Sequence, residues 1–590
     1  FIAPDDIEGF PLRALGETTR ERNIHSYAGK LTWQASTNHR FDVSFFGDPS
    51  SGPSGIQRFT ALKANTPSQF SALDAYGGHN QAIRYDGILS PNWFVEARVS
   101  HATTFFEELP ASDTHFTVDR TVSPWNRYGG IGYYDQAADG TSTQYSLIST
   151  NIVNAGGTHQ FRYGVGYEDI GFVRQINRTG PTFQLSDGQT TRGGAYMLIM
   201  PTTDTPSGKY YYVIRSFLGQ PADTKQAYLN WFAQDTWQIN NNFTIKAGIR
   251  WERQKLDGGE PGGVGACYDD EERVGDGGSG NGTPIACEYT WSNNWSPRVG
   301  AIWDITGNGK TKLYANYGRF FVKIPNDLAA RALAGDPGVT RADYFDEGLT
   351  RPIPDGVSVG GRDVHLITTS AHPALFENDT QSTYTDEYLV GFEFEAAPML
   401  NLGVRWIHRN MTTVLEDYAQ ASPLMYDLGY PGLGDVEYII DNISQSIETL
   451  DPTGTPGFEN LTRPLFEDPE HTYDAIELTA TKAYSNNWSL FASYRYSKLK
   501  GNFEGFYRSD NGQSDPSITS LFDFPTNDPD YSGIGGPRFG YLGDIRYQGT
   551  TLGAFPLPNN RPHQFRLYGN YTMGGLNLGI GADLGSGRIL

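Results

Sequence analysis

One stretch, residues 225–256, constrains the fold more than any other because apolar and polar residues alternate in it along two long arms. In the second arm, Thr244, Lys246, Gly248, Arg250 and Glu252 separate Phe243, Ile245, Ala247, Ile249 and Trp251. A period of two places each kind of side chain on its own face of a strand. The first arm repeats the pattern less cleanly, and the polar residues 239–242 join the two arms. The stretch therefore predicts an antiparallel hairpin with one apolar face.

The arms of this hairpin are long enough to cross a membrane. At about 3.3 Å per residue each arm reaches roughly 40 Å, about twice the length of a usual strand. A strand that is apolar on one side only, with tryptophan near its ends, suits a tilted passage through a bilayer. The chain contains no run of 18 apolar residues, which excludes a helical membrane protein.

The same alternation recurs along the chain and predicts eight hairpins with about 16 strands. The expected pairs are 27–33 with 41–45, 81–89 with 93–103, 144–153 with 160–168, 225–238 with 243–256, 296–305 with 311–321, 383–396 with 399–411, 472–483 with 488–499, and 562–573 with 576–585. Turns within hairpins are short, whereas about 30 to 60 residues connect most hairpins, which is uncommon in compact soluble domains. Outer-membrane barrels place short turns in the periplasm and long loops outside.

We therefore expect an all-β fold, a transmembrane antiparallel β-barrel with long extracellular loops and short periplasmic turns. Residues 1–25 are expected to be a loop remnant and residues 26–590 a partial transmembrane β-barrel domain. The alternative is a soluble β-sandwich, propeller or lectin array. A propeller would repeat short strands at a fixed period, whereas the spacing here is irregular and the strands are long.

Composition agrees with a barrel and argues against a nucleic-acid partner. Glycine (69 residues) and aromatic residues (13%) are abundant, and only 19% of residues are charged. The net charge of −22 is opposite in sign to a phosphate-binding surface and indicates a solvated acidic surface. The sequence begins without an initiator methionine or a signal peptide, so we expect a mature chain or a fragment.

An ordered set of short motifs runs through residues 225–590. It comprises Gln234-Asp235-Thr236-Trp237, Gly248-Ile249-Arg250-Trp251-Glu252, Ser296-Pro297-Arg298-Val299-Gly300, Tyr317-Gly318-Arg319-Phe320, Asp386-Glu387-Tyr388, Ser493-Tyr494-Arg495-Tyr496-Ser497 and Arg561-Pro562-His563-Gln564-Phe565. Together these motifs resemble the barrel of TonB-dependent outer-membrane receptors, specifically the Oar-like branch. Residues 324–331 are similar to a short helical insert of that branch.

The resemblance implies a barrel of about 22 strands closed around an N-terminal plug. It also implies that the plug and the last strands lie outside this chain. Its expected partners are outer-membrane lipid, an extracellular solute, its own plug and, through the plug, the inner-membrane TonB energy-coupling complex. The implied function is uptake of a scarce large solute, such as a siderophore, glycan or peptide, through rearrangement of the plug. Alternatives are an Oar-like surface adhesion protein, a protein-export conduit or a passive porin.

Charged side chains on the polar face are candidate lumen or plug contacts in such a receptor. These residues are Arg250, Glu252, Arg298, Arg405 and Arg495. Ordinary solvation of the lumen is the alternative role. Two groups of loop aromatics are candidate substrate contacts, with mutual packing of the loops as their alternative: Tyr210, Tyr211 and Tyr212, and Phe503, Phe506 and Tyr507.

Cys267 and Cys287 lie in one long loop and are expected to form a disulfide, as pairs of cysteines in exported loops usually do. No further ligand accompanies them at the spacing of a zinc site. The acidic residues between them lack the spacing of a calcium loop, so a solvated tip is favoured. The chain contains none of the usual motifs of hydrolases, metalloproteases or phosphate-binding loops. We therefore expect no catalytic residue, no metal and no cofactor.

Overall fold

The computed structural model describes residues 19–54, 70–122, 126–180, 195–216, 222–258, 267–268, 284–285, 288–326, 339–348, 350–351, 353, 358–359, 362–363, 367–369, 375–376, 380–419, 438–442, 470–501, 555–557 and 559–587. Every long element among these residues is a β-strand. No helix in this described part of the chain is long and apolar enough to span a bilayer.

Sixteen long strands form one antiparallel sheet. In spatial order they are β2 (Tyr27–Ser36), β3 (His39–Gly47), β5 (Ser71–Ser90), β6 (Trp93–Pro110), β9 (Tyr133–Asn154), β10 (Thr158–Arg178), β13 (Ala222–Gln238), β14 (Phe243–Asp257), β17 (Glu288–Trp303), β18 (Thr311–Phe321), β24 (Tyr384–Ala397), β25 (Leu400–Thr412), β28 (His471–Ser485), β29 (Trp488–Gly501), β31 (His563–Met573) and β32 (Leu576–Gly585). The short strands β1 (Glu21–Ile24), β4 (Ser50–Ser54) and β30 (Phe555–Pro556) extend the same sheet. The eight predicted hairpins are confirmed.

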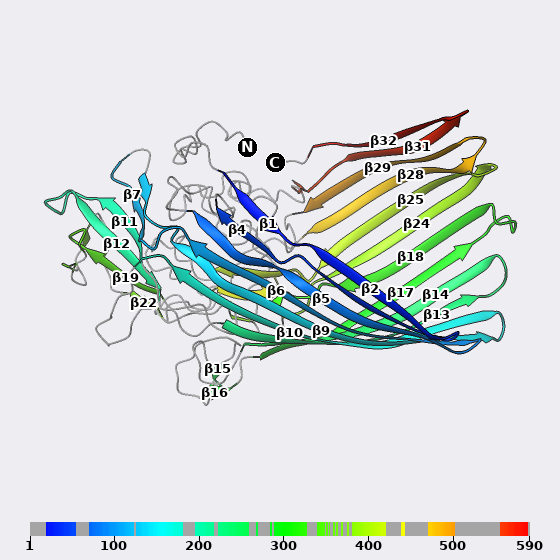
Figure 1. Cartoon of the computed structure of the whole chain (residues 1–590), viewed down its shortest axis with the longest axis horizontal. Coiled ribbons are helices and arrows are strands. Elements are labelled where there is room, and N and C mark those ends of the chain that lie inside the picture. Colours follow the sequence, from blue (N-terminus) through cyan, green and yellow to red (C-terminus); the bar gives the residue numbers. More distant parts are fainter. Residues whose placement is uncertain are drawn as a thin grey trace, which may run out of the picture.

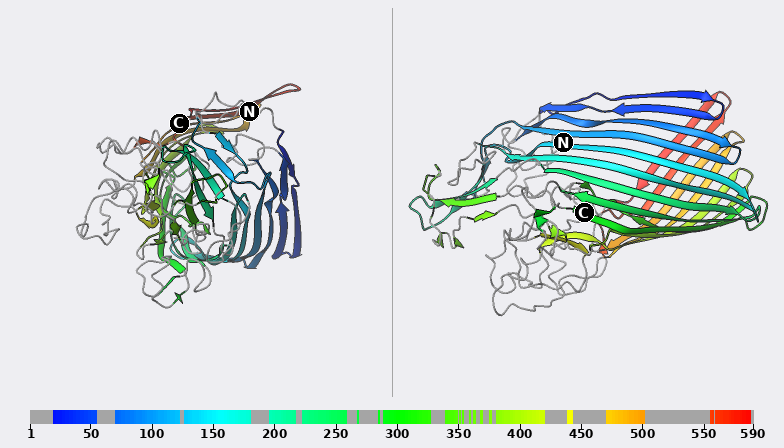
Figure 2. Two further views of the ribbon diagram at one scale, coloured as in Figure 1. Left: turned by 90° about the vertical axis from the view of Figure 1, so that its left-hand side faces the viewer. Right: turned by 90° about the horizontal axis from the view of Figure 1, so that it is seen from below.

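The sheet curls into an incomplete barrel, which Figure 2 shows from its end and from below. Among the described residues β2 and β32 are the long strands at its two edges, and no ladder pairs them with each other. Within the expected loop remnant, residues 1–18 lie outside the described part, and β1 pairs with β4.

Short turns gather at one end of the barrel and the long connections at the other (Figure 1). The turn between β28 and β29 uses Asn486 and Asn487, both at positive φ, as a tight right-twisted hairpin requires. In the longer turn after β17, the backbone N–H of Gly309 donates to Asp304 Oδ2 over 2.6 Å. This hydrogen bond holds the pKa of the Asp304 carboxyl below its ordinary value. These turns define the periplasmic end.

The two faces of the sheet differ as the alternation predicts. Val299, Leu478 and Ile580 lie on the outer face and are 49–58% exposed to the surroundings. Trp295 and Trp303 lie eight residues apart on β17, about 26 Å along the strand, which at a tilt of about 40° crosses roughly 20 Å of an apolar band about 25 Å tall. Aromatic residues at both ends of an apolar band are typical of a barrel in lipid.

A second sheet lies beyond the barrel on the extracellular side (Figure 1). It has six strands in the order β22 (Ile367–Thr369), β19 (Val339–Tyr344), β12 (Lys209–Ser216), β11 (Ala195–Pro201), β7 (Phe116–Asp119) and β8 (Asn126–Tyr128). These strands come from three different barrel connections, those after β6, β10 and β18. The sequence pattern predicts only loops in these three connections, so this extracellular sheet is an addition to the predicted fold.

The remaining strands are short and also lie in the long connections. They are β15 (Cys267–Tyr268) with β16 (Pro284–Ile285), β20 (Ser358–Val359) with β21 (Arg362–Asp363), and β23 (Leu375–Phe376), β26 (Leu415–Ala419) and β27 (Tyr438–Asn442).

Candidate functional site

The strand register places the predicted lumen residues on one face, opposite the apolar rows. Gly248 pairs with Arg298, and Arg298 pairs in turn with Gly318, so these positions share a face across three strands. Arg405 likewise pairs with Glu477, and Glu477 with Arg495. We call this face the inner wall. Two pockets indent it, and four of the five predicted residues line them.

The first pocket, here the cation pocket, has a volume of about 450 Å³ and spans β9, β10, β13, β14, β17, β18 and β24. Four cationic side chains line it: Arg162, Lys246, Arg250 and Arg298. Aromatic and amide side chains also line it, among them Phe232, Gln234, Asn316 and Phe320, and so do the acidic residues Asp235 and Glu387.

Glycines on neighbouring strands make room for this pocket. Arg298 lies between Gly248 and Gly318, while Gly300 lies between Lys246 and Asn316. A Cβ atom added to Gly300 would come within 2.2 Å of Asn316 Oδ1. Long polar side chains thus alternate with glycines across the strands, and the backbone of each glycine leaves space for its neighbour.

The four cations differ in their partners. Arg250 Nε donates to Glu252 Oε1 over 2.6 Å, and the Tyr228 hydroxyl donates to the same oxygen. Arg162 lies 3.6 Å from Glu96. The Arg298 guanidinium instead lies over the Phe320 ring, 4.6 Å from its centroid. Within the described part of the chain neither Arg298 nor Lys246 forms an ion pair, while Glu387, which also lines the pocket, is paired with Arg409.

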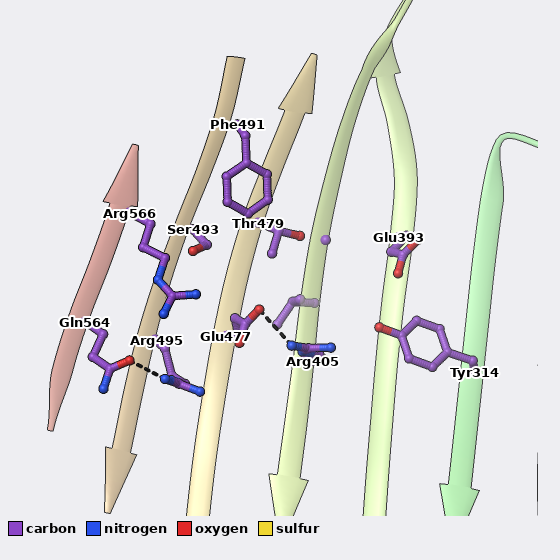
Figure 3. A pocket seen from close by; sticks show the side chains of 12 residues that line it. Tyr314, Glu393, Arg405, Glu477, Thr479, Phe491, Ser493, Arg495, Gln564 and Arg566 are labelled. Atoms are coloured by element: carbon purple, nitrogen blue, oxygen red, sulfur yellow. Dashed lines mark hydrogen bonds and ion pairs between the residues drawn. The ribbon is translucent and has the colours of Figure 1, made fainter. Parts of the chain in front are cut away.

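The second pocket, here the balanced pocket, has a volume of about 400 Å³ on β18, β24, β25, β28, β29 and β31. Figure 3 shows its side chains projecting from adjacent strands. Arg405 Nη2 donates to Glu477 Oε1 over 2.9 Å, and Arg495 donates to the amide oxygen of Gln564. Three arginines, Arg405, Arg495 and Arg566, share this pocket with two glutamates, Glu393 and Glu477.

A segment of the connection after β18, residues 322–326, crosses the inner wall; we call it the strap. Ile324 is fully buried, and its backbone is held by two glutamines. Gln254 accepts from the Ile324 N–H over 3.1 Å and donates to its carbonyl over 2.7 Å, while Gln226 donates to the same carbonyl over 2.9 Å. Lys323 reaches Glu168 on β10, 2.5 Å away. The strap therefore passes from β18 over β14 and β13 to β10.

The strap lies on the extracellular side of the cation pocket. Gln254 holds the strap, whereas Arg250 and Lys246 follow on the same face of β14 toward the periplasmic turn. The helical insert expected over residues 324–331 falls largely outside the described residues, since only residues 324–326 of it are described.

The predicted loop aromatics fall into two groups. Tyr210, Tyr211 and Tyr212 lie on β12 and are only 2–8% exposed, so they pack in the extracellular sheet as the packing alternative expects. Tyr210 and Tyr212 belong to the cluster on one face, and Tyr211 to the cluster on the other. Burial raises the pKa of Tyr211. Their contact with a substrate stays a prediction. Phe503, Phe506 and Tyr507 lie outside the described residues.

Only one of the two cysteines of the expected disulfide, Cys267, lies in the described part of the chain. The β15–β16 ladder places Cys267 opposite Ile285, two positions before Cys287. Cys287 and the acidic residues of this loop lie outside the described part, so the disulfide stays a prediction. In the part of the chain that the structure does describe, no group of three or more metal-ligating side chains gathers.

The sequence did not predict several polar side chains of the site, because their partners lie on other strands. Arg162 and Lys246 could have been added to the site from strand parity alone, since they alternate with apolar residues as Arg250 does. The glutamine contacts to the strap have no local signal, because their partner is 70 or more residues away along the chain. Pairs such as His408 and Asp474, 2.9 Å apart, likewise require the fold.

The chain belongs to the outer membrane beta barrel domain family, whose model matches residues 10–528. It is thus an integral outer-membrane barrel and not an enzyme. It is a TonB-dependent transporter-like barrel: it is 25% identical over 623 residues to the TonB-dependent transporter Oar of Myxococcus xanthus. The match covers 92% of this chain and 51% of that protein, so the chain spans about half the length of this curated relative.

A solved receptor with a TM-score of 0.50 shares the fold. The siderophore receptor PiuA of Acinetobacter baumannii has a TM-score of 0.50 and 12% identity over 97% of this chain and 65% of its own. The ferric-catecholate import receptor Fiu of Escherichia coli K12 has a TM-score of 0.46 and 12% identity, with the same two coverages. At 12% identity the likeness to PiuA concerns the fold alone.

Proposed function

We propose that this chain is the barrel of a TonB-dependent transporter that takes up a scarce large solute, such as a siderophore, glycan or peptide. The observation that carries the proposal is the inner wall, where charged and amide side chains line pockets within a barrel whose outer face is apolar. A polar passage through an apolar shell serves a solute that cannot cross lipid.

The mechanism we propose assigns different tasks to different parts of the protein. The extracellular connections capture the solute, and an N-terminal plug fills the barrel between transport events. The inner-membrane TonB complex pulls on the plug, and the solute then moves along the inner wall. The barrel residues bind and release the solute through hydrogen bonds and ion pairs, and no covalent step is needed.

The test is uptake by cells that lack the gene, compared with cells in which the full-length protein is restored. Depletion of iron chelates, oligosaccharides and peptides from the medium is followed by mass spectrometry, with and without a protonophore. The proposal predicts that deletion abolishes uptake of one solute class and that the protonophore does so as well. Uptake that survives the protonophore would indicate a passive porin.

A surface-interaction role is the second candidate, and the extracellular sheet favours it. Strands from three connections pack into one six-stranded layer, which is a more rigid surface than separate loops would give. If deletion leaves uptake unchanged but reduces attachment of cells to a surface, this role replaces transport. Loss of an exported protein from the medium would instead indicate an export conduit.

A further inference from the structure

We infer that the strap is a displaceable gate on the extracellular side of the barrel, one that leaves its place on the inner wall when a solute passes. The inference rests on the proposed transport function and adds a regulatory step to it. The fixed end of the gate is Val322, whose backbone N–H donates to the carbonyl oxygen of Thr383 over 2.9 Å. The residues that follow Val322 form the part that moves.

The position of the strap places it on the route of a solute. It crosses β14, β13 and β10 on the inner wall, on the extracellular side of the cation pocket. Ile324 is fully buried beneath the docked strap. A solute that moves along this part of the wall toward the periplasm meets the strap before it meets the pocket. Passage there therefore requires the strap to move.

Side chains hold the strap, whereas backbone ladders join the strands beneath it. In the part of the chain that the structure describes, residues 323–325 form no backbone–backbone hydrogen bond. The backbone of Ile324 is bonded instead to the side-chain amides of Gln254 and Gln226. These contacts can break without disturbing a strand ladder, so the strap can leave the wall while the barrel stays folded.

The groups that hold the strap can also bind a solute. Gln254 offers one donor and one acceptor to the backbone of Ile324, and an amide group of a solute can take the same two hydrogen bonds. Glu168 holds the Lys323 ammonium and can bind another cation in its place. The strap and such a solute compete for the same groups, and this competition supplies the differential affinity that displaces the strap.

Docking of the strap also buries an unsatisfied polar atom. Asn326 donates through Nδ2 to the carbonyl oxygen of Thr224 over 3.3 Å, but its Oδ1 is buried with no partner among the described residues. A buried acceptor that lacks a hydrogen bond destabilises the state in which it is buried. Undocking returns this oxygen to water, which offsets part of the loss of the glutamine contacts.

The test locks the strap to the wall of the full-length protein with a reducible bis-maleimide that joins Lys323→Cys to Glu168→Cys. Cys267 and Cys287 are replaced by serine in this background. In the matched control the same reagent joins Ser142→Cys to Glu168→Cys, because Ser142 on β9 donates to Glu168 over 2.8 Å and both lie on the sheet. Uptake by intact cells is measured before cross-linking, after it and after reduction of the reagent. Heat-modifiable migration on gels reports whether each barrel is folded.

We expect the strap cross-link to reduce uptake to the level of the gene deletion and reduction of the reagent to restore it. The control cross-link should leave uptake unchanged. Normal uptake with the strap cross-linked overturns the inference. So does an equal loss of uptake in the control, which would show that the reagent itself obstructs the barrel.

A second measurement follows the strap without a cross-link. Ile324→Cys places a thiol beneath the docked strap, and a sulfonated maleimide that does not cross membranes probes it on cells in the uptake medium. We expect severalfold faster labelling in energised cells than in cells treated with a protonophore. Val213→Cys, buried in the extracellular sheet, should label slowly in both. Equal labelling at position 324 in the two states overturns the inference.

The deletion strain separates this inference from the proposed function. If deletion abolishes uptake and the variant with the cross-linked strap imports the solute normally, transport stands and the gate fails. If deletion changes no uptake, the transport function itself fails, whatever the labelling gives.

Discussion

At the scale of single residues, Gln254 shows how one side chain fixes a segment that the sequence leaves undefined. Its amide group satisfies both backbone groups of Ile324, and Gln254 itself is only 1% exposed. A buried backbone group that loses its partner costs about 1–3 kcal/mol. The strap is therefore held by hydrogen bonds to the wall as well as by burial of Ile324.

Gln254→Ala should release the strap while the barrel stays folded. We expect faster hydrogen exchange at residues 322–326, by a factor that corresponds to about 1–3 kcal/mol of local stability. Gln160→Ala is the control, because Gln160 is an exposed residue on β10. Unchanged exchange at Ile324 in the Gln254 variant would show that the strap is held by packing alone.

Strand parity explains which residues of the site could be predicted. Arg250 and Arg298 alternate with apolar neighbours, so their face follows from the sequence once the strands are placed. Whether each arginine forms an ion pair does not follow from the sequence. Glu252, the partner of Arg250, lies on the same strand, whereas Phe320 contacts Arg298 from β18. Strand parity thus predicts which residues lie on the inner wall, whereas the fold is needed to distinguish an ion-paired cation from an unpaired one.

At the scale of elements, the hairpins were predictable within the membrane and less so beyond it. The strands expected over 144–153 and 160–168 extend to Tyr133–Asn154 and Thr158–Arg178. In the added part, residues 135–143 are mostly polar or small and do not alternate, since both faces of the sheet leave the lipid there. The extracellular sheet was missed for a related reason, because its short strands pair only with strands of other connections.

The extracellular sheet should behave as one unit. Val213 is fully buried between Met197, Ile199, Tyr211 and Tyr344, so Val213→Asp places an unpaired charge in that core. We predict that the connections after β6, β10 and β18 become protease-sensitive together, while heat-modifiable migration of the barrel is retained. Thr203→Asp, at an exposed position between β11 and β12, should leave all three resistant. Cleavage confined to the β11–β12 hairpin would contradict a shared core.

At the scale of the whole molecule, the barrel is divided into an apolar outer face and a polar inner wall. The apolar rows, the aromatic residues at both ends of the band and the cation pocket all follow from the same two-residue period. The extracellular sheet and the strap then organise one end of this barrel, and the tight turns close the hairpins at the other end.

The most direct measurement is spin-label accessibility along β14 of the full-length protein in lipid vesicles. Single cysteines are placed at positions 245–251 in a background with Cys267 and Cys287 replaced by serine. The account predicts that labels at 245, 247, 249 and 251 are reached by oxygen dissolved in the bilayer. Labels at 246, 248 and 250 should instead be shielded from it and face the aqueous relaxation agent or the protein interior. Equal accessibility at odd and even positions, or the reverse alternation, would contradict the barrel and the inner wall on which the proposed function rests.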